Sequence, residues 1–147
     1  MSEEQADSSR DRLFAGCFGC GPENDSGLGL AFKQDNDGVV CRTAIDANFV
    51  GYEDTVHGGI VSTLLDEAMG WALFEGLGRY GVTRKLTVEF RRPVKASTEL
   101  IVSARIIEQE GTTVRTEAAI KDSRARLLAS GSAEWSLVRT ARSRTSR

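Results

Sequence analysis

The 147-residue sequence predicts a single α+β domain in which one long helix covers one face of an antiparallel sheet. The helix is indicated by residues 57–75, whose apolar side chains recur with the 3.6-residue period of an α-helix. Every other periodic stretch alternates between apolar and polar residues. Short turn signals separate these stretches, which favours hairpins and therefore an antiparallel sheet.

Composition and charge exclude several classes of protein. Apolar residues make up 40% of the chain, which is enough to form a core. The 19 basic and 21 acidic residues leave a net charge of −2, without the basic excess of a nucleic-acid-binding protein. No apolar run approaches the ~20 residues that span a bilayer, and the polar N-terminus lacks a secretory signal. We therefore expect a cytoplasmic protein with neither nucleic acid nor membrane as a partner.

The composition of the two ends predicts the domain boundaries. Residues 1–14 are expected to be disordered or loosely attached, because the first dozen hold four acids and no large apolar side chain. The domain itself is expected at residues 15–138. Residues 139–147 contain four arginines and no acid, which is typical of a solubilising basic tail or of a contact to an anionic partner.

The elements are expected in the order of two strands, one helix and four strands. The chain enters the domain through a loop rich in Gly, Asn, Asp and Ser, and a further loop is expected at residues 46–56. The turn sequence Asp-Asn-Asp-Gly joins the first two strands, and Pro93 ends the third. The strands are predicted at residues 28–34, 39–45, 83–92, 99–110, 112–121 and 127–138.

The predicted helix has two different sides. At 100° per residue, its apolar side chains cluster on one side, and a stripe of small and polar residues lies opposite. The stripe consists of Gly59, Ser62, Thr63, Asp66 and Gly70. Close packing against another backbone would explain the small residues, and one satisfied hydrogen bond would explain Asp66. Alternatively, Asp66 is a carboxylate in a cleft, where burial raises its pKa and makes it a base or a nucleophile.

The helix begins at His57, Gly58 and Gly59. A glycine costs about 0.5–1 kcal/mol in a helix relative to alanine, so two in succession need a reason. Without a Cβ, a ligand can approach the N–H groups of the first turn, which suit the developing oxyanion of a thioester. Asp66 lies about 10 Å further along the helix, at 1.5 Å per residue. Two helices side by side, from two subunits, would bring both features to one site.

Several motifs resemble the hotdog-fold acyl-CoA thioesterases, in the branch typified by the phenylacetate-pathway enzymes. They are VHGGI at 56–60, TLLDEA at 63–68, GVT at 81–83, VEFRRPV at 88–94, and CFGCG at 17–21 with Asn24, Gly27 and Leu28. The resemblance spans about residues 17–138. It implies one central helix wrapped by an antiparallel sheet of five to six strands, in a homodimer or homotetramer.

The resemblance also implies roles for four residues. Asp66 would act as general base or nucleophile, and the backbone N–H of Gly58 would polarise the thioester carbonyl. Thr83 would hold the acid or the water, and His57 would order the loop before the helix. Strict alternation, however, places Thr83 on the face opposite to Leu86, so either Thr83 precedes regular pairing or a bulge turns it.

One position departs from the pattern of the resemblance. Some relatives carry an asparagine where this chain has Gly51, and that asparagine positions the carbonyl or the water. Asn48 and Asp54 lie near Gly51 in the sequence, and they are the alternative residues for the role of that asparagine.

Further residues are predicted to bind substrate. Gly59 and Ser62 lie on the stripe of the helix, whereas Arg91 and Arg92, near Arg84 and Lys85, suit the phosphates of CoA. A solvated strand end would equally explain these basic residues.

Two of the three cysteines have the spacing of a half zinc ribbon. The pair is Cys17 and Cys20, and a structural zinc site usually needs a second pair, for which only Cys41 and His57 remain. We therefore expect no metal and no cofactor, with the cysteines as small packing residues or as reactive thiols.

Together with these residues, the resemblance implies hydrolysis of an acyl-CoA thioester to the free acid and CoA. The alternative is a hotdog domain that binds acyl-CoA or another apolar ligand without converting it. A dehydratase on the same fold is a third possibility, but that chemistry normally requires a histidine base, and the single histidine precedes the glycine pair.

Overall fold

The computed structural model describes residues 13–138. Residues 1–12 and 139–147, and with them the basic tail and nearly all of the predicted N-terminal segment, lie outside the described residues. The described chain divides into two compact units, residues 13–31 and residues 32–138.

The first unit is a loop folded on itself. The strand predicted at residues 28–34 is largely wrong, because only β1 (Lys33–Asp35) is a strand in this region. The N–H groups of Leu28 and Leu30 donate to carbonyl oxygens of the preceding loop, at 2.8 and 2.9 Å, so they do not enter a sheet. Gly29 between them has a φ of +64°, which is incompatible with an extended strand.

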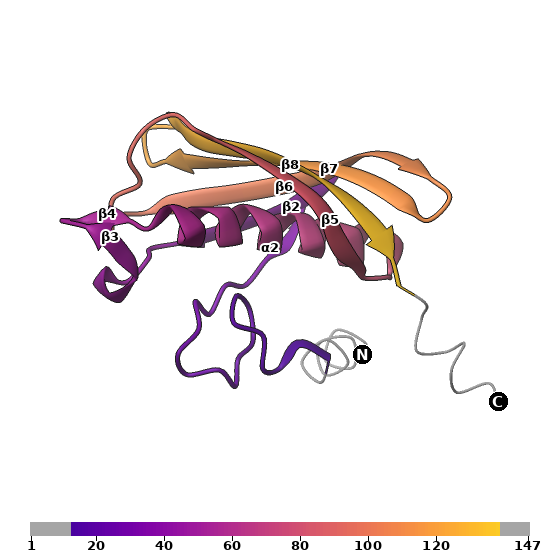
Figure 1. The fold of residues 1–147 in the computed structure, drawn as a ribbon, viewed down its shortest axis with the longest axis horizontal. Coiled ribbons are helices and arrows are strands. Elements are labelled where there is room, and N and C mark those ends of the chain that lie inside the picture. The colour runs from indigo at the N-terminus through magenta and orange to yellow at the C-terminus, as the bar shows by residue number, and fades with distance from the viewer. Residues whose placement is uncertain (1–12, 139–147) are drawn as a thin grey trace. The chain divides into compact units, whose positions relative to one another are not determined.

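The second unit consists of one long helix and a six-stranded antiparallel sheet, as predicted. Figure 1 shows helix α2 (Gly58–Leu77) lying along one face of the sheet. The sheet order is β1-β2-β6-β7-β8-β5, and every pairing is antiparallel. Besides β1, the strands are β2 (Gly38–Thr43), β5 (Gly81–Phe90), β6 (Leu100–Glu110), β7 (Thr113–Asp122) and β8 (Leu127–Leu137).

The segment at residues 46–56, predicted as a loop, contains short regular elements. A 3₁₀ turn η1 (Ala47–Phe49) precedes a two-stranded sheet of β3 (Val50–Tyr52) and β4 (Thr55–Val56). The Asp46 carboxylate caps this turn. Strands of two or three residues are too short to show alternation in the sequence.

The apolar side of α2 packs on the sheet, chiefly against β6. The apolar side chains on this side are buried, as the helical periodicity predicts. The buried residues are Val61, Leu64, Leu65, Ala68, Met69, Ala72 and Leu73. Each large apolar side chain contributes about 1.5–3 kcal/mol when it is fully buried. The helix ends at Gly78, whose left-handed conformation is typical of a C-terminal cap.

A buried polar pair lies between the sheet and the helix. The indole Nε1–H of Trp135 on β8 donates to the hydroxyl of Thr116 on β7, at 2.9 Å. The Trp135 ring reaches α2 at Gly70, where a Cβ would lie 3.3 Å from the ring. The absence of a side chain at Gly70 therefore allows close packing of the helix on the sheet. Close packing thus accounts for part of the stripe of small residues. Within residues 13–138, no helix is both long and apolar enough to cross a membrane.

Candidate active site

The candidate site centres on a hydrogen bond between α2 and the edge strand β5. The Thr83 hydroxyl on β5 donates to Oδ1 of Asp66 on α2, at 2.8 Å. The pairing of β5 with β8 shifts between Thr83 and Lys85, which leaves Arg84 as an extra residue in β5. This bulge turns Thr83 toward the helix, and it resolves the orientation that alternation in the sequence left open.

Asp66 is half-buried, and its surroundings favour the protonated form. Burial removes water from the carboxylate and raises its pKa, while the hydrogen bond from Thr83 lowers the pKa by a smaller amount. Within residues 13–138, Asp66 has no basic residue as an ion-pair partner. The result is a carboxylate that is more basic than an exposed aspartate.

The first turn of α2 leaves one N–H group open. Nδ1 of His57 accepts the N–H of Gly59 at 2.8 Å, and the carbonyl oxygen of His57 accepts the N–H groups of Ile60 and Val61. Among the described residues, the N–H of Gly58 therefore remains without a partner at this helix end. Because Nδ1 is an acceptor, a neutral His57 carries its proton on Nε2.

The two glycines of this turn meet different constraints. A Cβ on Gly59 would lie 3.1 Å from Nδ1 of His57 and would press on the cap. A Cβ on Gly58 would instead meet the ring of Phe90 at 3.6 Å, an ordinary contact. Gly59 thus leaves room for the cap, whereas Gly58 presents an open N–H beside an aromatic ring.

Phe90 is the residue near this turn that the sequence did not identify. By alternation it shares one face of the strand with Leu86 and Val88, and 59% of Phe90 is exposed. β5 is an edge strand, and none of its ten residues is buried. The signal in the sequence that could have identified Phe90 is a large aromatic residue at the end of a strand.

The hydroxyl groups of the helix stripe donate hydrogen bonds to the backbone of the same helix. Ser62, predicted to bind substrate, donates to the carbonyl oxygen of Gly58 at 3.0 Å. Thr63 donates in the same way to Gly59, at 2.9 Å. Both hydroxyls keep acceptor capacity, but their protons are committed to the helix backbone.

The basic residues predicted to bind phosphate separate into two environments. Arg91 forms an ion pair with Glu89 at 2.9 Å. Arg92 lines a hollow of about 460 Å³ together with Lys95, Arg124 and Arg126. The structure therefore places Arg92, and not Arg91, beside further basic side chains, in a hollow that Glu99 and Asp122 also line.

The residues near the missing asparagine have other contacts. Gly51 lies against His57, and a Cβ there would be 3.4 Å from the Cα of His57. The carboxylate of Asp54 pairs with Lys95 at 3.0 Å, and this hydrogen bond lowers the pKa of Asp54. The backbone N–H of Asn48 bonds to the Asp46 carboxylate.

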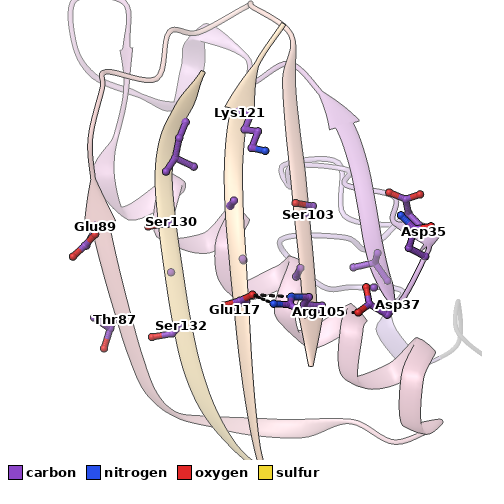
Figure 2. Close-up of a pocket in the computed structure, with 18 residues that line it drawn as sticks. Asp35, Asp37, Thr87, Glu89, Ser103, Arg105, Glu117, Lys121, Ser130 and Ser132 are labelled. Carbon is purple, nitrogen blue, oxygen red and sulfur yellow. Dashed lines mark hydrogen bonds and ion pairs between the residues drawn. The ribbon is translucent and has the colours of Figure 1, made fainter. Parts of the chain in front are cut away.

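A larger hollow, of about 670 Å³, lies on the sheet face that points away from α2 (Figure 2). It is lined by small and charged side chains, including the ion pair of Arg105 and Glu117. None of the predicted site residues lines it. The candidate chemistry and this hollow therefore belong to different faces of the second unit.

Comparison with known sequences identifies related proteins. The family described as the Thioesterase superfamily matches residues 53–129, which include α2 and β5. Acyl-coenzyme A thioesterase 13 of Homo sapiens is 25% identical over 79 residues, covering 53% of this chain and 56% of that protein. The corresponding protein of Mus musculus is 27% identical over 75 residues, covering 50% and 54%. This chain thus matches about half the length of these relatives.

Comparison with solved structures identifies the same fold. The PaaI protein of the E. coli phenylacetic acid degradation operon superposes with a TM-score of 0.71 and 23% identity, covering 80% of this chain and 88% of that one. A hypothetical thioesterase protein from Streptococcus pneumoniae, solved with coenzyme A, gives a TM-score of 0.68 and 23% identity, covering 74% and 85%. The predicted hotdog fold is confirmed.

The raised pKa of Asp66 predicts a pH-dependent effect on stability. Because the folded-state pKa lies above the usual 3.8, ionisation costs stability as the pH rises through that folded-state value. Asp66→Asn cannot ionise, and its amide oxygen still accepts from Thr83. We expect this variant to be more stable than the wild type at pH 7, with the difference disappearing near pH 3, as measured by urea unfolding.

Asp122 provides the matched control, because its pKa is lowered by hydrogen bonds, chiefly from the Arg126 backbone N–H. Asp122→Asn should therefore lose stability at pH 7 and match the wild type in acid. An Asp66→Asn protein that is less stable than the wild type at pH 7 would contradict the proposed cost of ionisation.

Proposed function

The chain belongs to the Thioesterase superfamily, and from this membership we propose that it hydrolyses an acyl-CoA thioester to the free acid and CoA. The observation that carries the proposal is the half-buried Asp66, held by Thr83 and set on the helix whose first turn leaves the N–H of Gly58 open. The relatives named acyl-coenzyme A thioesterase 13 support the same substrate class. The motifs around His57 and Asp66 favour the phenylacetate-pathway-like branch.

The proposed reaction begins with water. Asp66 removes a proton from the water as it attacks the thioester carbonyl carbon, and the negative charge moves to the carbonyl oxygen. The N–H of Gly58 and the positive end of the helix dipole stabilise that oxyanion. Collapse of the intermediate breaks the C–S bond, and the leaving thiolate takes up a proton.

A second route uses Asp66 as the nucleophile. Its carboxylate would attack the carbonyl carbon, expel the CoA thiolate and form a mixed anhydride, which water then hydrolyses. Both routes need ionised Asp66, and both use Gly58 in the same way. His57 caps the turn that presents Gly58, since its Nδ1 lone pair is occupied by Gly59.

We propose that the complete site needs two copies of the chain. Gly58 and Asp66 are separated by about two helical turns, or about 12 Å, so one helix cannot bring both to one carbonyl group. The edge strand β5 carries exposed apolar side chains, Val82 and Phe90 at 59% and Leu86 at 37%. Such an edge is suited to pairing with a second copy, which makes a dimer the minimum unit.

The basic side chains that line the hollow beside Arg92 are suited to binding the phosphates of CoA. Arg92 and Arg124 line the same hollow, and neither forms an ion pair within residues 13–138. We propose Arg92 as the principal phosphate contact, while Arg91 contributes once it leaves Glu89. Gly59 and Ser62 shape the entrance to the helix turn.

Asp66→Asn is the direct test of the proposed function. We expect kcat to fall by at least ~100-fold, because general-base catalysis contributes about 10²–10⁴-fold. The measurement is free-thiol release from a panel of acyl-CoAs, with unfolding curves to confirm that the variant folds. A wild type that binds acyl-CoA tightly without releasing thiol would instead favour the non-catalytic ligand-binding domain.

Thr83→Val and Thr83→Ser test the hydrogen bond to Asp66. The bond lowers the Asp66 pKa, so its loss in Thr83→Val should raise that pKa further. Since the reaction needs ionised Asp66, the acid limb of kcat/KM against pH should move to higher pH. Thr83→Ser keeps the hydroxyl and should retain the wild-type profile. Identical profiles for Val and wild type would exclude this positioning role.

Mixing two inactive variants tests the shared site. Asp66→Asn and Gly58→Val proteins should each be inactive. If each site combines Gly58 of one chain with Asp66 of the other, a mixed dimer has one intact site. Random mixing should then restore about one quarter of wild-type activity, because half the dimers are mixed. No recovery after verified subunit exchange would contradict a shared site, as would a fully active monomer in sedimentation.

A further inference from the structure

We propose that Cys17 and Cys20 form a two-thiolate binding site for a thiophilic metal ion of the Zn²⁺ or Cd²⁺ type. Both cysteines lie in the first unit, and the proposed hydrolysis uses neither of them. The sequence alone offered only half of a zinc ribbon. The structure adds the placement of the two sulfur atoms and of the backbone around them.

The sulfur atoms are close enough to share an ion. The Sγ atoms of Cys17 and Cys20 lie within 4.8 Å of each other. Two thiolates bound tetrahedrally to zinc at ~2.3 Å are about 3.8 Å apart. Binding therefore requires an approach of about 1 Å at most, which small side-chain rotations supply without unfolding the loop.

The backbone holds the two cysteines in this arrangement. The N–H of Gly21 donates to the carbonyl oxygen of Cys17 at 2.8 Å, which folds the chain back directly after Cys20. A Cβ on Gly21 would collide with the carbonyl oxygen of Ala15 and the nitrogen of Cys17. Only glycine permits so tight a return, so the glycine that follows the second cysteine is part of the proposed site.

The loop also directs a hydrogen-bond donor at one sulfur. The N–H of Gly19 donates to Sγ of Cys17 at 3.3 Å. This donor therefore helps to fix the position of the Cys17 sulfur within the loop.

The coordination is open within this unit. Two thiolates fill half of a tetrahedral site, and residues 13–31 contain no histidine and no third cysteine. Water or groups outside residues 13–31 must complete the coordination. The site is therefore suited to an exchangeable ion with a preference for sulfur, unlike the closed four-ligand sites that hold structural zinc.

Cadmium titration of the reduced full-length chain tests the proposal. The thiolate-to-cadmium charge-transfer band in the ultraviolet should appear and saturate at no more than one Cd²⁺ per chain. Cys17→Ser and Cys20→Ser should each abolish at least nine tenths of the band. Cys41→Ser is the matched control, because Cys41 lies in β2 with 4% exposure and should leave the band unchanged.

Thermal melting of each variant without metal confirms that it folds. A wild type without the band, a band that survives in Cys17→Ser or Cys20→Ser, or its loss in Cys41→Ser would overturn the proposal. The readout is optical and needs no thioester turnover. Failure of the metal site is therefore distinguishable from failure of the proposed hydrolysis.

Discussion

Burial of one side of α2 against the sheet determines where every candidate catalytic group lies. Leu64, Leu65 and Met69 are completely shielded from solvent, which fixes the rotation of the helix about its axis. With 3.6 residues per turn, the opposite side must then carry the stripe that includes Asp66. Asp66 consequently reaches the border between the core and solvent, where β5 supplies Thr83. Its raised pKa follows from this border position.

The long elements could be predicted from the sequence because their patterns repeat many times. The helix and the four strands after it extend over ten residues or more, so periodicity identified them. The backbone contacts that keep residues 28–30 out of a strand and the short elements within residues 46–56 could not be predicted, because tight hydrogen bonds and very short strands leave no periodic pattern. The orientation of Thr83 depends on an extra residue in the pairing of β5 with β8, which one strand alone does not reveal.

The glycine pair shows how one motif can meet two physical demands. The sequence indicates that the pair needs a reason, but only the geometry separates the two residues. Gly59 accommodates the imidazole of His57, which takes up its N–H. That cap, together with the His57 carbonyl, satisfies the donors that follow and leaves the N–H of Gly58 as the open one. In the proposed mechanism, His57 therefore supports the oxyanion position through this cap.

The environment of Asp66 makes its carboxylate more basic than an exposed one and still allows it to ionise. A fully exposed aspartate has a pKa near 4 and is a weak base at neutral pH. A fully buried and unpaired aspartate would remain protonated and could accept no proton. Partial burial raises the pKa, and the hydrogen bond from Thr83 opposes that rise. The bulge in β5 thus has a chemical consequence, because it sets this opposing contact and keeps the carboxylate between the two limits.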